Sequence, residues 1–119
     1  MINDQDFREF HYNMLGSRSK ITGDLVLYGD TIITSQVEGS IEISDNGKLI
    51  LERGSYVKGR VKAIDLEIFG EVDGDIECSG LVSIRSSAQV TGTIKAGRLV
   101  IYPGAIVETH SSSLEKISL

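Results

Sequence analysis

The chain has 119 residues, a formal net charge of −5 and a single cysteine, Cys78. The length suggests one domain, and the acidic balance argues against nucleic acid as a partner, because phosphate binding usually requires a basic patch. No disulfide can form within the chain, no segment has the pattern of a secretory signal, and no run approaches the ~18 apolar residues of a membrane-spanning helix. These features predict a cytoplasmic protein.

Residues 1–20 are predicted to form a flank outside the main fold. The segment contains Phe7 and Phe10, which could lie on one face of a short helix. Its acidic and basic residues balance, which weakens a role in binding an anionic membrane surface. Three roles are open for this flank: capping the main fold, touching lipid or staying disordered.

Residues 21–110 contain a repeated unit of the form Val-x-Gly-x-Ile, whose clearest copy is residues 72–76. A second element of the form Leu-x-Ile, such as residues 66–68, lies between successive copies. Apolar and polar residues alternate with a period of two in both elements, which indicates β-strands rather than helices. The gaps vary in length and the longer ones carry turn residues, so we expect loops at the corners of the fold. The glycine of the first element recurs as Gly23, Gly39, Gly59, Gly74 and Gly92.

Stacked copies of this unit predict an all-β, single-domain parallel β-helix with about six windings. A hairpin meander would also alternate, but it would not explain why successive units share one internal order. In a stacked coil, equivalent apolar residues form columns that point inward. The expected columns are Val37, Val57, Val72, Val90 and Val107; Ile41, Val61, Ile76 and Ile94; and Leu49, Leu66, Val82 and Leu99.

Outward charged residues provide an independent indication of the same stacking. When the windings are aligned, basic residues lie between acidic ones in consecutive copies. Each exposed pair is worth only about 0–1 kcal/mol, so the predicted role of these ladders is to oppose slips of register. A solvated face with a chance order of charges is the alternative. The ladder residues are Glu38, Lys58 and Asp73; Arg60 and Asp75; and Glu42, Lys62, Glu77 and Lys95.

The side wall of such a coil is closed, whereas both ends expose unpaired backbone groups and apolar side chains. We therefore predict that the ends stack on other copies and that the protein polymerises. The alternative is that a flank folds over one end and blocks it, and the serine-rich tail at residues 111–119 is the C-terminal candidate. The residues expected at the polymer contact are Ile21, Leu25, Leu27, Leu99, Ile101 and Val107.

Outward apolar residues offer a second candidate surface, for lateral bundling, a partner protein or a membrane. A continuous exposed patch would mark such a surface, whereas single residues interrupted by Glu67 and Ser83 would not. Both interpretations are open. The candidate residues are Phe7, Phe10, Ile50, Phe69, Val100 and Tyr102.

No group of residues indicates catalysis, a metal site or a cofactor. His11 and His110 lack partners at ligand spacing, and Cys78 is expected in a small-residue column of the core. The glycines are single and periodic, so they do not form a phosphate-binding loop. A β-helical acyltransferase is the enzymatic alternative, but those enzymes have a stricter hexapeptide repeat and usually a histidine within the coil. The sequence therefore predicts a protein that is not an enzyme.

The Val-x-Gly-x-Ile-x-Ala units, their Leu-x-Ile partners and the turn at residues 103–105 resemble the bactofilins over residues 20–110. The resemblance implies a right-handed, three-faced β-helix with flexible flanks and a role in the bacterial cytoskeleton. It further implies non-polar filaments that form without nucleotide and join N-terminus to N-terminus and C-terminus to C-terminus. The implied partners are other copies of the chain, cell-envelope or motility proteins and, peripherally, the cytoplasmic face of the inner membrane.

Overall fold

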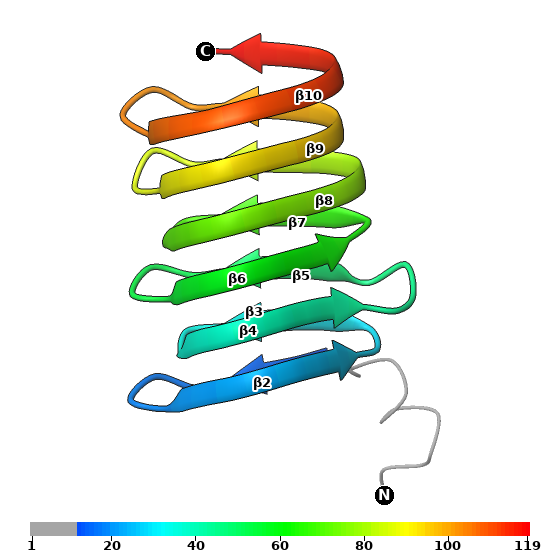
Figure 1. The fold of residues 1–119 in the computed structure, drawn as a ribbon, viewed down its shortest axis with the longest axis vertical. Helices are drawn as coiled ribbons and strands as arrows, with labels where there is room; N and C mark the ends of the chain where they lie inside the picture. The colour runs from blue at the N-terminus through cyan, green and yellow to red at the C-terminus, as the bar shows by residue number, and fades with distance from the viewer. Residues whose placement is uncertain (1–11) are drawn as a thin grey trace, which may run out of the picture.

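The computed structural model describes residues 12–119, which form a parallel β-solenoid without any helix (Figure 1). Phe7, Phe10 and His11 lie outside the described residues, so the roles expected of them stay predictions. The strands in chain order are β1 (Tyr12–Leu15), β2 (Lys20–Leu27), β3 (Asp30–Ile33), β4 (Gln36–Ile43), β5 (Lys48–Leu51), β6 (Tyr56–Ala63), β7 (Asp65–Ile68), β8 (Glu71–Ile84), β9 (Gln89–Ile101) and β10 (Ile106–Ser118).

Two ladders of parallel strands build the coil. The first contains β2, β4 and β6, followed by the first parts of β8, β9 and β10. The second contains β1, β3, β5 and β7, followed by the second parts of β8, β9 and β10. Each strand pairs with its equivalent one winding away, which confirms the predicted parallel β-helix of about six turns.

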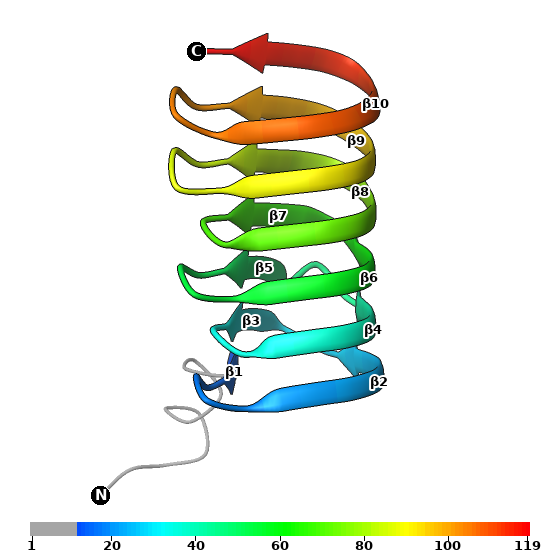
Figure 2. The same ribbon diagram turned by 60° about the vertical axis from the view of Figure 1, so that its left-hand side comes forward.

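The coil is right-handed and has three faces. In Figure 1 the strands of the first ladder run from left to right across the front, the chain returns behind them through the second ladder, and successive windings rise toward the C-terminus. Figure 2 shows the same stack of windings turned about its long axis. Each of these strands bends at its glycine, or at Thr109 in β10, and so covers two faces. Gly39 and Gly59, for example, both have a φ of +140°. Glycine is needed there because a Cβ makes this backbone conformation costly.

The core contains the columns that the sequence predicted and a further one, formed by Ile33, Leu51, Ile68 and Ile84. Val37, Val57 and Val72 follow one another in register, and each is 0% exposed. Stacking such side chains removes them from water on every side, at roughly 25 cal/mol for each Å² of apolar surface buried. The other two predicted columns are also buried and contain Ile41, Val61, Ile76 and Ile94, and Leu49, Leu66, Val82 and Leu99.

Aspartate side chains connect successive windings at the corner that leads into the second ladder. The Oδ1 atom of Asp45 accepts hydrogen bonds from the backbone N–H groups of Gly29, at 2.8 Å, and Gly47, at 3.0 Å. The Oδ1 atom of Asp65 accepts one from the N–H of Leu81 at 2.9 Å. The two bonds to Asp45 favour its ionised form and hold the pKa of its carboxyl group below the ordinary value.

The lowered pKa of Asp45 makes its contribution to stability depend on pH. Because the folded pKa lies below the ordinary value of 3.8, the contribution is complete above that value and is lost as the pH falls through the folded pKa. We expect Asp45→Asn to lower the midpoint of urea unfolding at neutral pH, and this difference to shrink as the pH approaches about 3. Urea titrations at the two pH values test this; a constant difference would show that the carboxylate charge contributes nothing.

Cys78 lies in an inward column between Ala63 and Ala96, as expected of a small core residue. It is 3% exposed, and burial raises the pKa of its thiol to about 12. We expect the folded protein to resist alkylation by iodoacetamide and the denatured protein to react fully, because the thiolate is the reactive form. Mass spectrometry of the labelled protein tests this, and rapid labelling without denaturant would mean that this winding opens readily.

Candidate assembly surfaces

The two ends of the coil carry unpaired strand edges. Among the described residues, β1 and β2 pair only with β3 and β4, respectively, and β10 pairs only with β9. These terminal strands lie at opposite extremes of the rod, at the bottom and the top of Figure 1. Each therefore has an edge whose N–H and C=O groups face away from the coil, and such an edge is a template for pairing with another chain.

The N-terminal end surface is formed by the inward residues of β1 and β2. Leu15, Ile21, Leu25 and Leu27 pack against the core on one side but are only partly buried, since no further winding within residues 12–119 covers them. Three of these residues were predicted for the polymer contact, and the structure places all three together. Leu15 was assigned to the flank by sequence reasoning; it joins them because β1 pairs with β3. This end is apolar.

The C-terminal end surface is formed by the inward residues of β10. Val107 continues its column as predicted, because it pairs with Val90. Polar residues lie over the other columns, so this end differs in character from the N-terminal one. The remaining pairs are Ser111 over Ile94, Ser113 over Ala96, Lys116 over Leu99 and Ser118 over Ile101.

The polymer contact predicted for the C-terminal end needs correction at Leu99. This residue is 0% exposed, because Lys116 in β10 covers it, so it does not reach the end surface. Ile101 is partly buried beneath Ser118, and only Val107 lies in the terminal winding itself.

The coil also extends beyond the expected flanks in both directions. β1 lies within the predicted N-terminal flank, and β10 continues to Ser118 rather than stopping near residue 110. Both segments lack the Val-x-Gly unit that indicated a winding. They form strands because their main chains pair along the edges of β3 and β9, and that pairing does not require apolar side chains.

The outward charged residues stack in the order that the sequence predicted. Glu38 pairs in register with Lys58, and Lys58 with Asp73. Arg60 is likewise in register with Asp75. The third ladder, also in the predicted order, consists of Glu42, Lys62, Glu77 and Lys95.

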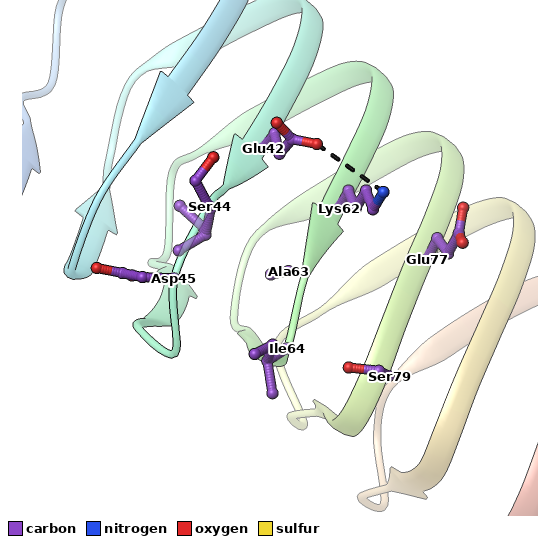
Figure 3. A pocket seen from close by; sticks show the side chains of 9 residues that line it. Glu42, Ser44, Asp45, Lys62, Ala63, Ile64, Glu77 and Ser79 are labelled. Atoms are coloured by element: carbon purple, nitrogen blue, oxygen red, sulfur yellow. Dashed lines mark ion pairs between the residues drawn. The ribbon is translucent and has the colours of Figure 1, made fainter.

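Few of these neighbours form close ion pairs. Lys62 Nζ lies 3.9 Å from Glu42 Oε1, as Figure 3 shows, and both side chains are exposed. Asp73 instead accepts a hydrogen bond from the hydroxyl of Thr91 at 3.1 Å. Because exposed pairs contribute little, the part these ladders play in fixing the register stays a prediction.

Reversing one charge in the ladder tests whether the charged residues help to fix the register. We expect Asp75→Arg to lower the free energy of unfolding by about 1 kcal/mol, because an arginine opposite Arg60 adds like-charge repulsion and the bond from the Thr93 hydroxyl is lost. Asp75→Asn, which removes the charge but keeps an acceptor oxygen, is the matched control. Urea unfolding at low and high salt measures the effect, and a neutral or stabilising Asp75→Arg would argue against a register role.

The outward apolar residues do not form one continuous patch within residues 12–119. Ile50 lies beside Ile32, and Val100 beside Ile117, but Glu67 and Ser83 separate the two groups along the column. Two further candidates lie on either side of Arg85, whose guanidinium carbon is 5.5 Å from the ring centroid of Phe69 and 4.1 Å from that of Tyr102. A lateral or membrane contact through these residues stays a prediction.

One recess of the side wall lies against the charged ladders. This recess, drawn in Figure 3, has a volume of about 280 Å³ and lies beside the ladder residues Glu42, Lys62 and Glu77. Within residues 12–119 no cluster of three His, Cys, Asp or Glu side chains could hold a metal ion. The same part of the chain contains no helix long and apolar enough to cross a membrane.

The fold and its surfaces define the class: a small parallel β-solenoid whose terminal strands leave unpaired edges at its two ends. Residues 13–112 match the bactofilin family, which is described as polymer-forming and cytoskeletal. The chain belongs to the bactofilin family, as its repeat indicated. Bactofilin BacO of Myxococcus xanthus (strain DK1622) is 32% identical to it over 92 residues, which cover 77% of this chain and 71% of that protein. No solved structure matches the chain significantly.

Proposed function

We propose that this bactofilin assembles end to end, without nucleotide, into non-polar filaments. The observation that carries the proposal is the apolar N-terminal end surface, where Leu25 and its neighbours adjoin unpaired strand edges. A second copy of the chain would cover the apolar residues and would supply hydrogen-bond partners for the backbone edge. The polymer-forming character of the family supports self-association.

The glycines support assembly that needs no nucleotide. In phosphate-binding loops, backbone N–H groups are free to point at the ligand. Here Gly39 is in register between Gly23 and Gly59 in the first ladder, so its neighbourhood is occupied by adjacent windings. A Cβ on Gly59 would overlap the carbonyl oxygen of Gly39, which shows how closely the backbones approach. The column closes the coil and offers no phosphate cradle.

The cellular role that follows is a scaffold rather than an enzyme. A rod with a regular charged side wall and associating ends can present many identical sites along a filament. We propose that cell-shape, cell-wall, motility or polarity factors bind there, at the cytoplasmic face of the inner membrane. The outward residues Ile50, Val100 and Tyr102 are candidates for such a lateral contact.

Sedimentation and negative-stain electron microscopy test the assembly. The full chain is purified, treated first with apyrase to remove nucleotide and afterwards with EDTA to remove divalent metal, and compared over a range of concentrations. We expect unbranched filaments in the pellet, unchanged by added ATP or GTP. Filaments that disappear after apyrase treatment would contradict the nucleotide-independent assembly.

A capped, non-polymerising interaction module is the second candidate, and the polar residues over the last winding favour it. Ser111 and Lys116 occupy inward positions, and solenoids use polar terminal windings to remain monomeric. This candidate predicts monomers at every protein and salt concentration. Light scattering coupled to gel filtration distinguishes it from the filament proposal.

A further inference from the structure

The two ends of the solenoid are chemically unequal. At the N-terminal end the columns begin with Leu15, Ile21, Leu25 and Leu27. At the C-terminal end three of these four columns finish in serine, and only the column of Ile21 ends in an apolar residue, Val107. A fifth column, which contains Leu99, begins with Asn13 and ends in Lys116. The large apolar residues of that last winding, Ile106, Leu114 and Leu119, are 51%, 95% and 62% exposed rather than lying over the core.

This inequality decides which ends fit one another. Head-to-tail stacking would place Ser111 of one copy against Leu25 of the next, and Ser118 against Leu15, so three of the four apolar columns would meet a serine and only Ile21 would meet an apolar residue. Joining two N-terminal ends instead buries apolar residues against apolar residues. Because burial is worth roughly 25 cal/mol for each Å², the symmetric junction is favoured over the head-to-tail one.

The first winding is self-complementary about Gly23. A two-fold axis through this residue places Ile21 opposite Leu25 on the inner side, and Thr22 opposite Asp24 on the outer side, as a hydroxyl donor facing a carboxylate. No atom of residues 12–119 lies within 4 Å of the place where a Cβ of Gly23 would stand, whereas the equivalent place at Gly39 is filled by the Gly23 carbonyl. The backbone of a second copy therefore has room to approach at this corner.

We infer that the C-terminal junction of the filament is the weak one and that Lys116 controls it. This inference rests on the proposed end-to-end assembly. It adds the junction at which assembly is regulated and the charged residue that regulates it. Consider two C-terminal ends that meet about a two-fold axis through the Thr109 corner. The face of the coil opposite this corner contains Lys116, and the axis places that face against the same face of the second copy. The two lysines then face one another over the buried Leu99 columns.

The surroundings of Lys116 do not neutralise it. Within the described part of the chain Lys116 forms no ion pair. The adjacent Glu115 is directed to Arg98, 3.5 Å away. An inward-pointing lysine on a terminal strand is a recognised way in which proteins discourage edge-to-edge pairing. Repulsion between two such lysines is screened by salt, since the Debye length falls from about 30 Å at 0.01 M to about 3 Å at 1 M.

Lys116→Leu tests the inference in the full chain, with Lys95→Leu as the matched control. Lys95 is exposed and outward on the side wall, so its replacement changes net charge equally without touching an end. We expect wild-type assembly to rise as NaCl increases from about 0.05 to 0.5 M. Lys116→Leu should assemble at low salt at a roughly tenfold lower protein concentration and lose that salt response. Lys95→Leu should behave as wild type.

A second variant separates charge from apolar gain. Lys116→Gln removes only the repulsion, so it should abolish the salt response while lowering the assembly concentration less than Lys116→Leu. Salt-insensitive wild-type filaments, or filaments whose concentration and salt dependence are the same in both Lys116 variants, would overturn the inference and leave end-to-end assembly standing. Monomers in the wild type and in every variant would overturn both.

Discussion

Replacing Leu25 with arginine is expected to stop assembly while leaving the solenoid folded. Leu25 faces inward in the first winding and is only partly buried, so in the monomer a long cationic side chain can reach water from that position. In the junction the same cation would lie in an apolar contact, and a two-fold junction contains it twice. We expect the protein concentration needed for filaments to rise by at least about a hundredfold, measured by sedimentation and electron microscopy.

Val26→Arg is the control for this change. Val26 is the next residue of β2, points to the outer face and is 52% exposed, so it adds the same charge to the same winding away from the end surface. We expect Val26→Arg to keep both the β-rich circular dichroism spectrum and the filaments. If Leu25→Arg assembled as readily as Val26→Arg, the polymer contact would not lie on the N-terminal end surface.

Replacing Gly59 with alanine is expected to destabilise the fold severely. Gly59 has a φ of +140°, and a Cβ there would overlap the carbonyl oxygen of Gly39 in the preceding winding. The backbone conformation alone costs of order 1–3 kcal/mol for a residue with a Cβ, and the overlap forces the windings apart in addition. We expect Gly59→Ala to lower the free energy of unfolding by about 4 kcal/mol or more, as measured by urea denaturation.

Gly23→Ala separates these two costs. Gly23 occupies the same column with a φ of +126°, but no atom in the described part of the chain lies within 4 Å of its Cβ position. We expect Gly23→Ala to lower the free energy of unfolding by only about 1–3 kcal/mol in the monomer. Equal losses for the two variants would mean that close contact between windings is not what the glycine column provides.

Much of the fold could be predicted from the residues alone, because a stacked coil repeats one environment in every winding. Val37, Val57 and Val72 recur with a glycine two residues later, and this recurrence identified both the inward column and the corner. The alternating signs of Glu38 and Lys58 aligned the same windings from the opposite face of the strand. Two independent columns that agree leave little freedom in the register.

The limits of the coil could not be predicted in the same way. The segment around Ser111 and Ser113 lost the apolar alternation that indicates a strand, although its main chain pairs fully with β9. Backbone pairing at an existing edge depends weakly on side-chain type, and sequence patterns therefore underestimate it. The consequence was a misplaced end surface, with Leu99 expected on it although Lys116 covers it.

The same limit applies to the end surfaces themselves. Ile21, Leu25 and Leu27 were recognised because they continue apolar columns, whereas Leu15 was not, since the sequence before it contains no repeat. The chemical difference between the two ends depends on the pairing of β10 with β9, which places serine and lysine over apolar columns. The sequence alone does not show whether a serine-rich segment packs on the core or is disordered in solution.

Diffraction from oriented filaments tests end-to-end assembly most directly. Strands perpendicular to the solenoid axis are spaced by about 4.8 Å, so stacked rods should give a strong meridional reflection at about that spacing along the filament axis. The same reflection should vanish from Leu25→Arg preparations, which contain no filaments. Filaments that form but show the reflection off the meridian, or on the equator, would mean that the rods associate side by side and that the ends are not the polymer contacts.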